Sequence, residues 1–261
     1  LYYTKMLTLT GSLRRHRAIS SIIVSTTSAS PFHTLNDLYE KAVQEFPNQK
    51  LIGTKNKDTN TFEWITYDEF GKVTQNLKHK LHQEGFKNGD KLAIISNNSK
   101  EWAITAYAGY ALGMPVVPLY PNQKKEEWDY IINDSDAKIV FAQTDEVRSG
   151  LNGIPSLSNI PVVNFENTDS NSNESFSSWC EDITITNDIE NNIMPQNVAS
   201  LIYTSGTTGK PKGVMLTHEN ICSNILSVAK LFGDRIDSDT VTLSILPWAH
   251  VYGQTMELHS M

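Results

Sequence analysis

Apolar residues along most of this chain follow two alternating patterns, one typical of buried strands and the other of helices. The strand-like runs are short and nearly continuous, as in residues 91–96, 116–119 and 137–141. Between them, apolar side chains recur every three or four residues, which is the spacing of one helix face. This regular alternation predicts an α/β fold with mostly parallel sheets flanked by helices.

The chain ahead of these strands predicts a helix, a hairpin and a second helix. Thr34 is a good N-cap for the first helix, which Pro47 ends. Residues 50–54 and 62–66 have the composition of two short strands around a polar turn. The capping-box sequence that begins at Thr66 then predicts the second helix.

Two further boundaries bear on where a ligand would lie. Asn98, with Glu101 three residues later, is expected to cap the helix that follows the strand at 91–96. Residues 240–246 predict a late strand, and residues 247–253 a loop at its end. Ligands commonly bind at such loops in open α/β sheets, so this loop is a candidate site.

Two stretches fall outside the pattern. Residues 166–197 are rich in Asn, Ser, Asp and Thr, which is typical of an exposed connection, although residues 183–185 have the composition of a short edge strand. Residues 1–30 contain three arginines within four positions and no Asp or Glu. This composition predicts a mitochondrial presequence, and the alternative is a disordered basic leader of a cytoplasmic protein. Either way we leave these residues out of the fold, so 31–261 form one partial domain.

Composition limits the classes of function. With 261 residues, of which 39% are hydrophobic, the chain can bury a substantial core. A net charge of −7 argues against a general nucleic-acid binder, because phosphate backbones attract basic surfaces. Cys180 and Cys222 have no metal-ligand spacing, which indicates a reducing compartment. The sequence has no apolar run of the roughly 20 residues that span a bilayer, so any membrane contact is expected to be peripheral.

Candidate chemistry concentrates in residues 200–218, where a loop rich in Gly, Ser and Thr and carrying two lysines joins two apolar strands. Glycines allow close backbone approach, hydroxyls donate hydrogen bonds and lysines supply charge, so the stretch predicts a phosphate cradle. It is not a Walker loop, because only two residues separate Gly206 from Gly209 and a proline follows Lys210. It is not a dinucleotide fingerprint either, since a strand resumes at Gly213. A hairpin with a flexible turn is the plain structural alternative.

The sequence TSGTTGKPKG at 204–213 resembles, at every position, the signature loop of the adenylate-forming, AMP-binding synthetases. That family includes acyl-CoA synthetases, luciferases and the adenylation domains of peptide synthetases. Residues 66–70, 89–91 and 109–119 are similar to the family's first blocks, although these signals are weaker. Residues 246–254 resemble the aromatic block that lines the acyl pocket, in the form found in long-chain fatty-acyl-CoA synthetases.

The resemblance implies a two-step reaction. A fatty acid carboxylate attacks the α-phosphate of ATP and releases pyrophosphate, and the thiol of coenzyme A then displaces AMP. It implies Mg²⁺ as well, with Lys212 as a catalytic residue, Thr207 at the metal and Lys210 projecting into solvent. The residues that the resemblance places at the nucleotide phosphates are Thr204, Ser205, Gly206, Thr207, Thr208, Gly209, Lys210 and Lys212.

The second block supplies the candidates for acid binding. By resemblance, His250 flanks the carboxylate and the nucleotide and is the second catalytic candidate. Trp248, Tyr252 and Gly253 are candidates for contact with the substrate. The two aromatic residues are equally compatible with ordinary packing.

The family's later blocks have no counterpart before Met261. These blocks carry the adenine and ribose contacts, an acidic magnesium ligand, the domain hinge and a C-terminal catalytic lysine. We therefore expect an incomplete N-terminal domain without the C-terminal domain, and a fragment that is inactive by itself. Two alternatives stay open: a ligase for another carboxylic acid, and a catalytically dead module that binds a nucleotide or a partner.

Overall fold

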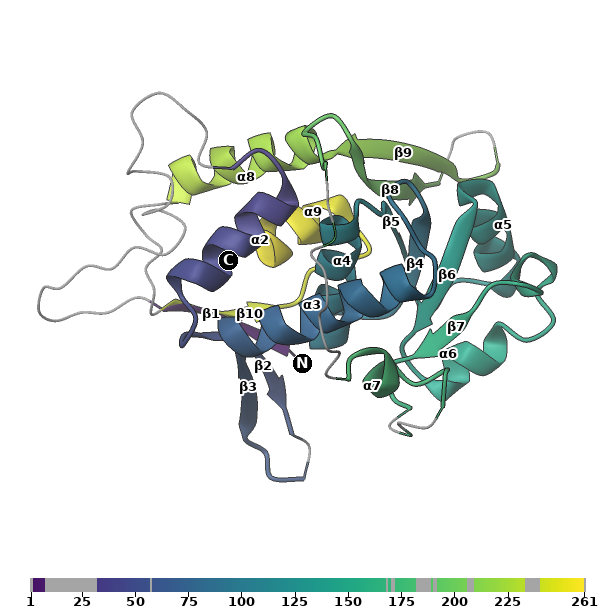
Figure 1. The fold of residues 1–261 in the computed structure, drawn as a ribbon, viewed down its shortest axis with the longest axis horizontal. Coiled ribbons are helices and arrows are strands. Elements are labelled where there is room, and N and C mark those ends of the chain that lie inside the picture. The colour runs from purple at the N-terminus through teal and green to yellow at the C-terminus, as the bar shows by residue number, and fades with distance from the viewer. Residues whose placement is uncertain are drawn as a thin grey trace, which may run out of the picture.

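The computed structural model describes residues 2–7, 32–56, 58–167, 169, 172–181, 189, 192–205, 209–232 and 240–260. They form two sheets with helices packed against them (Figure 1). The larger sheet has six strands and the smaller has four. One hydrophobic cluster contains residues of both sheets, so the two sheets share a core.

The larger sheet has the strand order β7-β6-β4-β5-β8-β9, and its neighbours are parallel except for β8 and β9. Helices connect the successive strands from β4 to β7, as the hydrophobic pattern predicts. The predicted α/β class is therefore confirmed. The strands are β4 (Lys91–Ile95), β5 (Val116–Leu119), β6 (Ala137–Ala142), β7 (Val162–Asn164), β8 (Val198–Thr204) and β9 (Lys212–Thr217).

Both faces of the central strands β4, β5 and β6 are covered, because these strands are apolar on both sides. In β4, Leu92 and Ile94 pack into one core cluster, and Ala93 and Ile95 pack into another. The first cluster includes residues of α3 (Tyr67–Gln83) and α4 (Lys100–Leu112), and the second includes residues of α5 (Lys125–Ser135) and α6 (Asp145–Gly150). Figure 1 shows where these helices lie beside the sheet. The chain thus leaves β4 toward one face and leaves β5 and β6 toward the other, which opens a crevice at their carboxyl ends.

The start of α4 differs from the prediction. Its N-cap is Ser99, whose Oγ accepts a 3.0 Å hydrogen bond from the Trp102 backbone N–H. Asn98 and Glu101 do not form the predicted cap, because Asn98 bonds to a segment about 150 positions later in the chain. Gly113 ends the helix with a left-handed φ of 72°, which favours glycine.

The smaller sheet has the order β10-β1-β2-β3 and is antiparallel throughout. Its strands are β1 (Tyr2–Leu7), β2 (Lys50–Lys55), β3 (Phe62–Thr66) and β10 (Thr240–Ser244). The predicted hairpin is the β2–β3 pair. The sequence predicts that residues 1–30 lie outside the fold, whereas the structure places Tyr2–Leu7 between β2 and β10. Residues 8–31 lie outside the described residues.

Two helices join the smaller sheet to the shared core. α2 (Leu35–Glu45) has the predicted N-cap Thr34, and α8 (His218–Phe232) follows β9 directly. The Leu35 N–H donates to Nδ1 of His218 at 3.2 Å, which ties the two helices together. The remaining short elements are η1 (Pro155–Leu157), α7 (Phe176–Trp179), α9 (Val251–Gly253) and η2 (Gln254–Leu258).

The polar connection is only partly described. Trp179 is 4% exposed and packs against the body, whereas the predicted edge strand at 183–185 lies outside the described residues. Among the helices that the structure describes, none is long and apolar enough to cross a membrane.

Candidate functional site

The glycine-rich loop joins β8 to β9 at the carboxyl end of β8. Thr204 and Lys212 are paired across its base, and both side chains are exposed, as is that of Ser205. Gly209 has a φ of 110°, a backbone conformation that side chains disfavour. Residues 206–208, which include the predicted magnesium ligand, lie outside the described residues. The base of the loop presents hydroxyls and an ammonium group, which suits an anion.

Helix α5 holds both arms of this loop. Before the loop, the Tyr203 hydroxyl donates to Oδ2 of Asp134 at 2.8 Å. Near the end of the loop, Nζ of Lys210 lies 5.2 Å from the ring centroid of Tyr130, one helical turn from Asp134. Lys210 was expected to project into solvent. It is exposed, but it lies over an aromatic face that attracts a cation.

Close packing also fixes the arm that precedes the loop. A Cβ atom on Gly213 would lie 3.0 Å from the Tyr203 ring, so the ring rests on the glycine of the neighbouring strand. Burial and the Asp134 carboxylate raise the pKa of Tyr203, which keeps its hydroxyl protonated as a donor.

His250 lies at the N-cap of α9 and is exposed. Its Nδ1 accepts a 3.1 Å hydrogen bond from the Tyr252 backbone N–H. This bond assigns the hydrogen of a neutral imidazole to Nε2. His250 therefore presents an N–H donor to solvent, which can bond to a carboxylate or phosphate oxygen.

The other candidates in this block lie in different surroundings. Trp248 is 1% exposed and packs edge-to-face on Trp102, with 5.6 Å between ring centroids. Tyr252 is 55% exposed. Gly253 is buried, and a Cβ atom there would lie 2.2 Å from the Pro247 carbonyl oxygen, so only glycine fits.

A cleft of about 580 Å³ lies between the two sheets. It is at the carboxyl ends of β4, β5 and β6, the place where open α/β sheets bind ligands. The Asn97 backbone and side-chain N–H groups donate to Oε1 of Gln143 at 2.9 and 3.1 Å, which joins the ends of β4 and β6. Tyr120 and Trp248 also line the cleft.

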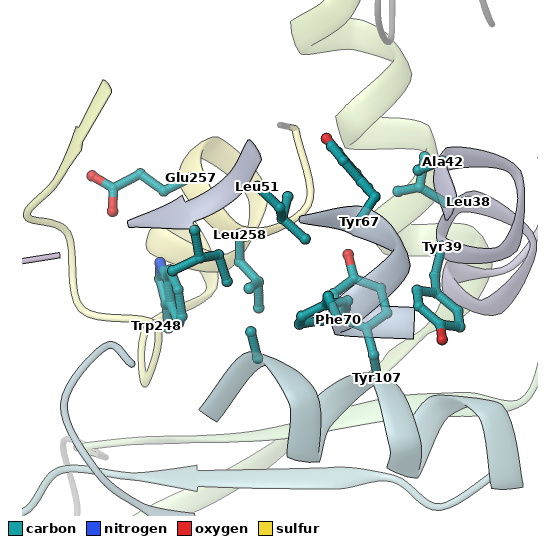
Figure 2. Close-up of a pocket in the computed structure, with 12 residues that line it drawn as sticks. Leu38, Tyr39, Ala42, Leu51, Tyr67, Phe70, Tyr107, Trp248, Glu257 and Leu258 are labelled. Atoms are coloured by element: carbon teal, nitrogen blue, oxygen red, sulfur yellow. The ribbon is translucent and has the colours of Figure 1, made fainter. Parts of the chain in front are cut away.

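Trp248 lines a second, smaller cavity as well, of about 40 Å³ (Figure 2). Helices α2, α3 and α4, strand β2 and the segment after α9 form its walls. Burial raises the pKa of both Tyr39 and Tyr67 to about 12, so these lining residues are neutral. The apolar part of the lining includes Leu51, Phe70, Ala103 and Leu258.

Four residues that hold the two candidate loops had no predicted role there. Asp134 and Tyr130 share one face of a helix, but their partners lie in another part of the sequence, 69 positions later for Asp134. Asn98 and Glu257 hydrogen-bond to residues 244–248, and the partners of Asn98 are 146 to 150 positions away. The spacing of residues along the sequence does not predict such pairs.

A comparison of the sequence with models of known protein families identifies the family of this chain. A model described as AMP-binding enzyme matches residues 39–261. This chain belongs to the AMP-binding enzyme family. Within this family of adenylate-forming ligases, its curated relatives include long-chain acyl-CoA synthetases.

Among them, Long chain acyl-CoA synthetase 6, peroxisomal, of Arabidopsis thaliana is 30% identical over 95% of this chain and 38% of its own length. Long-chain-fatty-acid–CoA ligase 1 of Homo sapiens is 27% identical over 86% of this chain and 34% of its own length. The chain therefore spans little more than a third of these AMP-binding enzymes.

Solved structures of AMP-binding enzymes share the fold. The N-terminal domain of FACL13 from Mycobacterium tuberculosis has a TM-score of 0.66 at 21% identity, over 87% of this chain and 54% of that one. Apo MatB from Rhodopseudomonas palustris has a TM-score of 0.67 at 21% identity, over 87% of this chain and 43% of that one. Likeness at this identity shows the fold alone.

Proposed function

We propose that the whole protein containing this chain activates a fatty acid with ATP and transfers the acyl group to coenzyme A. The observation that carries the proposal is the loop between β8 and β9. It matches the signature of adenylate-forming enzymes and presents Thr204, Ser205 and Lys212 at the edge of the sheet. The names of the curated relatives support the choice of acid.

The loop acts on the first step. A carboxylate oxygen attacks the α-phosphorus, the bond from this phosphorus to the β-phosphate bridging oxygen breaks, and pyrophosphate leaves with the negative charge. Lys212 and the hydroxyls of Thr204 and Ser205 bind the β- and γ-phosphates and stabilise that charge. In the second step the thiol sulfur of coenzyme A attacks the acyl carbonyl carbon, and AMP is the leaving group.

His250 holds the acid in this proposal. Its Nε2–H donates to a carboxylate oxygen, which orients the other oxygen toward the phosphate. The bond from the Tyr252 N–H to Nδ1 keeps the imidazole in the tautomer that donates.

The cavity beside Trp248, which is lined mainly by apolar and aromatic residues together with Glu257, supports an aliphatic substrate. A volume of about 40 Å³ holds a few water-sized groups, so it accommodates a short segment of a chain. A long acyl chain needs further space, which the proposal assigns to parts of the whole protein beyond this cavity.

Magnesium enters the proposal as the counter-ion of the ATP phosphates, with Thr207 as its ligand in this chain. The described residues contain no group of three or more His, Cys, Asp or Glu side chains that could hold a metal ion. A hydroxyl beside the nucleotide phosphates is a ligand type that Mg²⁺ accepts, and when bound the ion supplies positive charge. Every other role here belongs to the chain's own residues.

Mitochondrial targeting by the leader is a separate proposal. It is supported by the arginines and the absence of acidic residues in residues 1–30. Fusing residues 6–30 to a fluorescent reporter tests it: import into mitochondria is expected, and diffuse cytosolic fluorescence would refute it.

Pyrophosphate exchange into ATP tests the enzymatic proposal. The whole protein is assayed with acetate, octanoate, palmitate and benzoate. We expect the fastest exchange with palmitate. Exchange that is fastest with benzoate or acetate would overturn the assignment of a fatty acid. Binding of ATP without exchange for any acid would indicate a nucleotide-binding module instead of an enzyme.

A further inference from the structure

Two side chains hold the loop that follows β10: Asn98, 146 to 150 positions before its partners, and Glu257, 11 to 13 positions after them. Glu257, which is 8% exposed, uses Oε1 to accept hydrogen bonds from the backbone N–H groups of Ile245 and Leu246, at 3.1 and 3.0 Å. Its Oε2 accepts from the Ser244 hydroxyl at 2.6 Å. A carboxylate with three donors is well suited to a buried position, because hydrogen bonds offset the loss of hydration.

Asn98 holds the same loop from the other side. Its amide nitrogen donates to Oγ of Ser244 and to the carbonyl oxygen of Leu246, both at 2.8 Å. Its amide oxygen accepts from the Trp248 N–H at 2.8 Å. Both amide hydrogens and the amide oxygen of Asn98 are therefore bonded to residues 244–248.

Together the two side chains satisfy every backbone donor in this part of the loop. Glu257 binds the N–H groups of Ile245 and Leu246, Asn98 binds that of Trp248, and Pro247 has no N–H. The Ser244 hydroxyl links the two, because it accepts from Asn98 and donates to Glu257. The loop thus has a defined conformation although it lies outside both sheets.

The held segment leads directly to His250. The His250 N–H donates to the Pro247 carbonyl at 3.0 Å, and the Gln254 side chain donates to the Trp248 carbonyl at 2.8 Å. A shift of residues 245–248 would consequently move the imidazole. Asn98 lines the cleft and Glu257 the smaller cavity, but neither needs to contact a substrate to have this effect.

We infer that Asn98 and Glu257 are positioning residues that set the place and orientation of the His250 imidazole for the adenylation step. This inference rests on the proposed function, because it gives His250 the task of holding the carboxylate. It extends that proposal to two residues outside both signature blocks.

The variants Glu257→Gln and Asn98→Asp in the whole protein test the inference. Gln places an NH₂ group against donors, and Asp removes both donors of Asn98 and adds a charge beside Glu257. We expect the kcat of pyrophosphate exchange to fall roughly tenfold to hundredfold, with the KM for ATP changed by less than about twofold. The exposed pair Glu126→Gln and Asn122→Asp are matched controls, and both are expected to keep wild-type kcat.

A second measurement separates positioning from loss of fold and does not require activity. The imidazole ¹H NMR signal of His250, identified by its absence in His250→Gln, is expected to shift in both test variants while the other resolved signals stay in place. The milder Ser244→Ala variant serves where either test variant fails to fold, and the same changes are expected.

Different results of these two measurements lead to different conclusions. A normal kcat with an unshifted His250 signal in the folded variants would overturn the inference. A parallel loss of ATP affinity and kcat would also overturn it, because that pattern indicates general damage. If the wild-type protein shows no exchange, the proposed function fails, and the His250 signal still decides whether these residues position the imidazole.

Discussion

The Tyr203 hydroxyl, just before the glycine-rich loop, donates a 2.8 Å hydrogen bond to the Asp134 carboxylate on α5. The bond joins the strand that leads into the loop to a helix on the face of the sheet. Since Lys210 lies over Tyr130 on the same helix, α5 contacts the chain at both ends of the loop.

Tyr203→Phe tests this anchor. The substitution keeps the ring on Gly213 and removes only the hydroxyl. We expect the free energy of unfolding to fall by about 0.5–1.5 kcal/mol, measured by urea denaturation. Tyr252→Phe is the matched control, because its side chain is exposed and its hydroxyl has no such anchoring role. Equal stability of Tyr203→Phe and wild type would show that the bond does not anchor the loop.

Two glycines should resist substitution for different reasons. Gly253→Ala places a methyl group 2.2 Å from the Pro247 carbonyl oxygen, so the loop before His250 must move. Gly209→Ala meets no atom of the described residues within 4 Å but forces alanine to a φ of 110°. We expect Gly253→Ala to lower the unfolding free energy by about 1–3 kcal/mol and Gly209→Ala by about 1–2 kcal/mol. Gly253→Ala should shift the NMR signal of His250, and Gly209→Ala should not. A His250 signal that shifts in Gly209→Ala but not in Gly253→Ala would contradict this prediction.

Stability should fall in mild acid because two histidines are buried. Burial lowers the pKa of His218 to about 4 and that of His259 to about 3. Below the unfolded value near 6.5, the unfolded chain binds more protons than the folded one, so stability is complete above that pH and is lost as the pH falls toward 4. Each histidine contributes about 1.4 kcal/mol per pH unit in this range.

Urea denaturation at pH 7.5, 6 and 5 measures this effect. His218→Gln is expected to reduce the slope of stability against pH, although it also weakens the bond from the Leu35 N–H. His82→Gln, at an exposed position on α3, is the matched control for the substitution of a histidine by glutamine. A slope that is the same in wild type and His218→Gln would rule out a contribution from His218.

Short-range patterns in the sequence predicted much of the fold. The N-caps at Thr34 and Thr66 are present because each hydroxyl accepts from the backbone N–H of the acidic residue three positions later, whose carboxylate accepts from the backbone N–H of the cap. The strand-loop-strand arrangement of the glycine-rich segment follows from apolar runs on both sides of Gly209. Interactions between residues that are a few positions apart can be predicted from the sequence in this way.

Interactions across the sequence were not predicted. The sequence predicts Asn98 as a helix cap because that role needs only its neighbours, whereas its partners belong to the loop after β10. Lys210 looked solvent-directed because Tyr130 is distant in the sequence. The place of β1 between β2 and β10 also depends on pairing with strands far along the chain.

The most direct test of the central claim is Lys212→Ala in the whole protein. Lys212 is paired with Thr204 at the base of the loop, so its ammonium can bind the phosphates that leave as pyrophosphate. We predict that pyrophosphate exchange slows by about 10²-fold or more, that the dissociation constant of the fatty acid stays within about twofold, and that Lys210→Ala has a much smaller effect. Equal losses of exchange and acid binding, or no loss of exchange, would contradict the assignment of this loop to the phosphates of ATP.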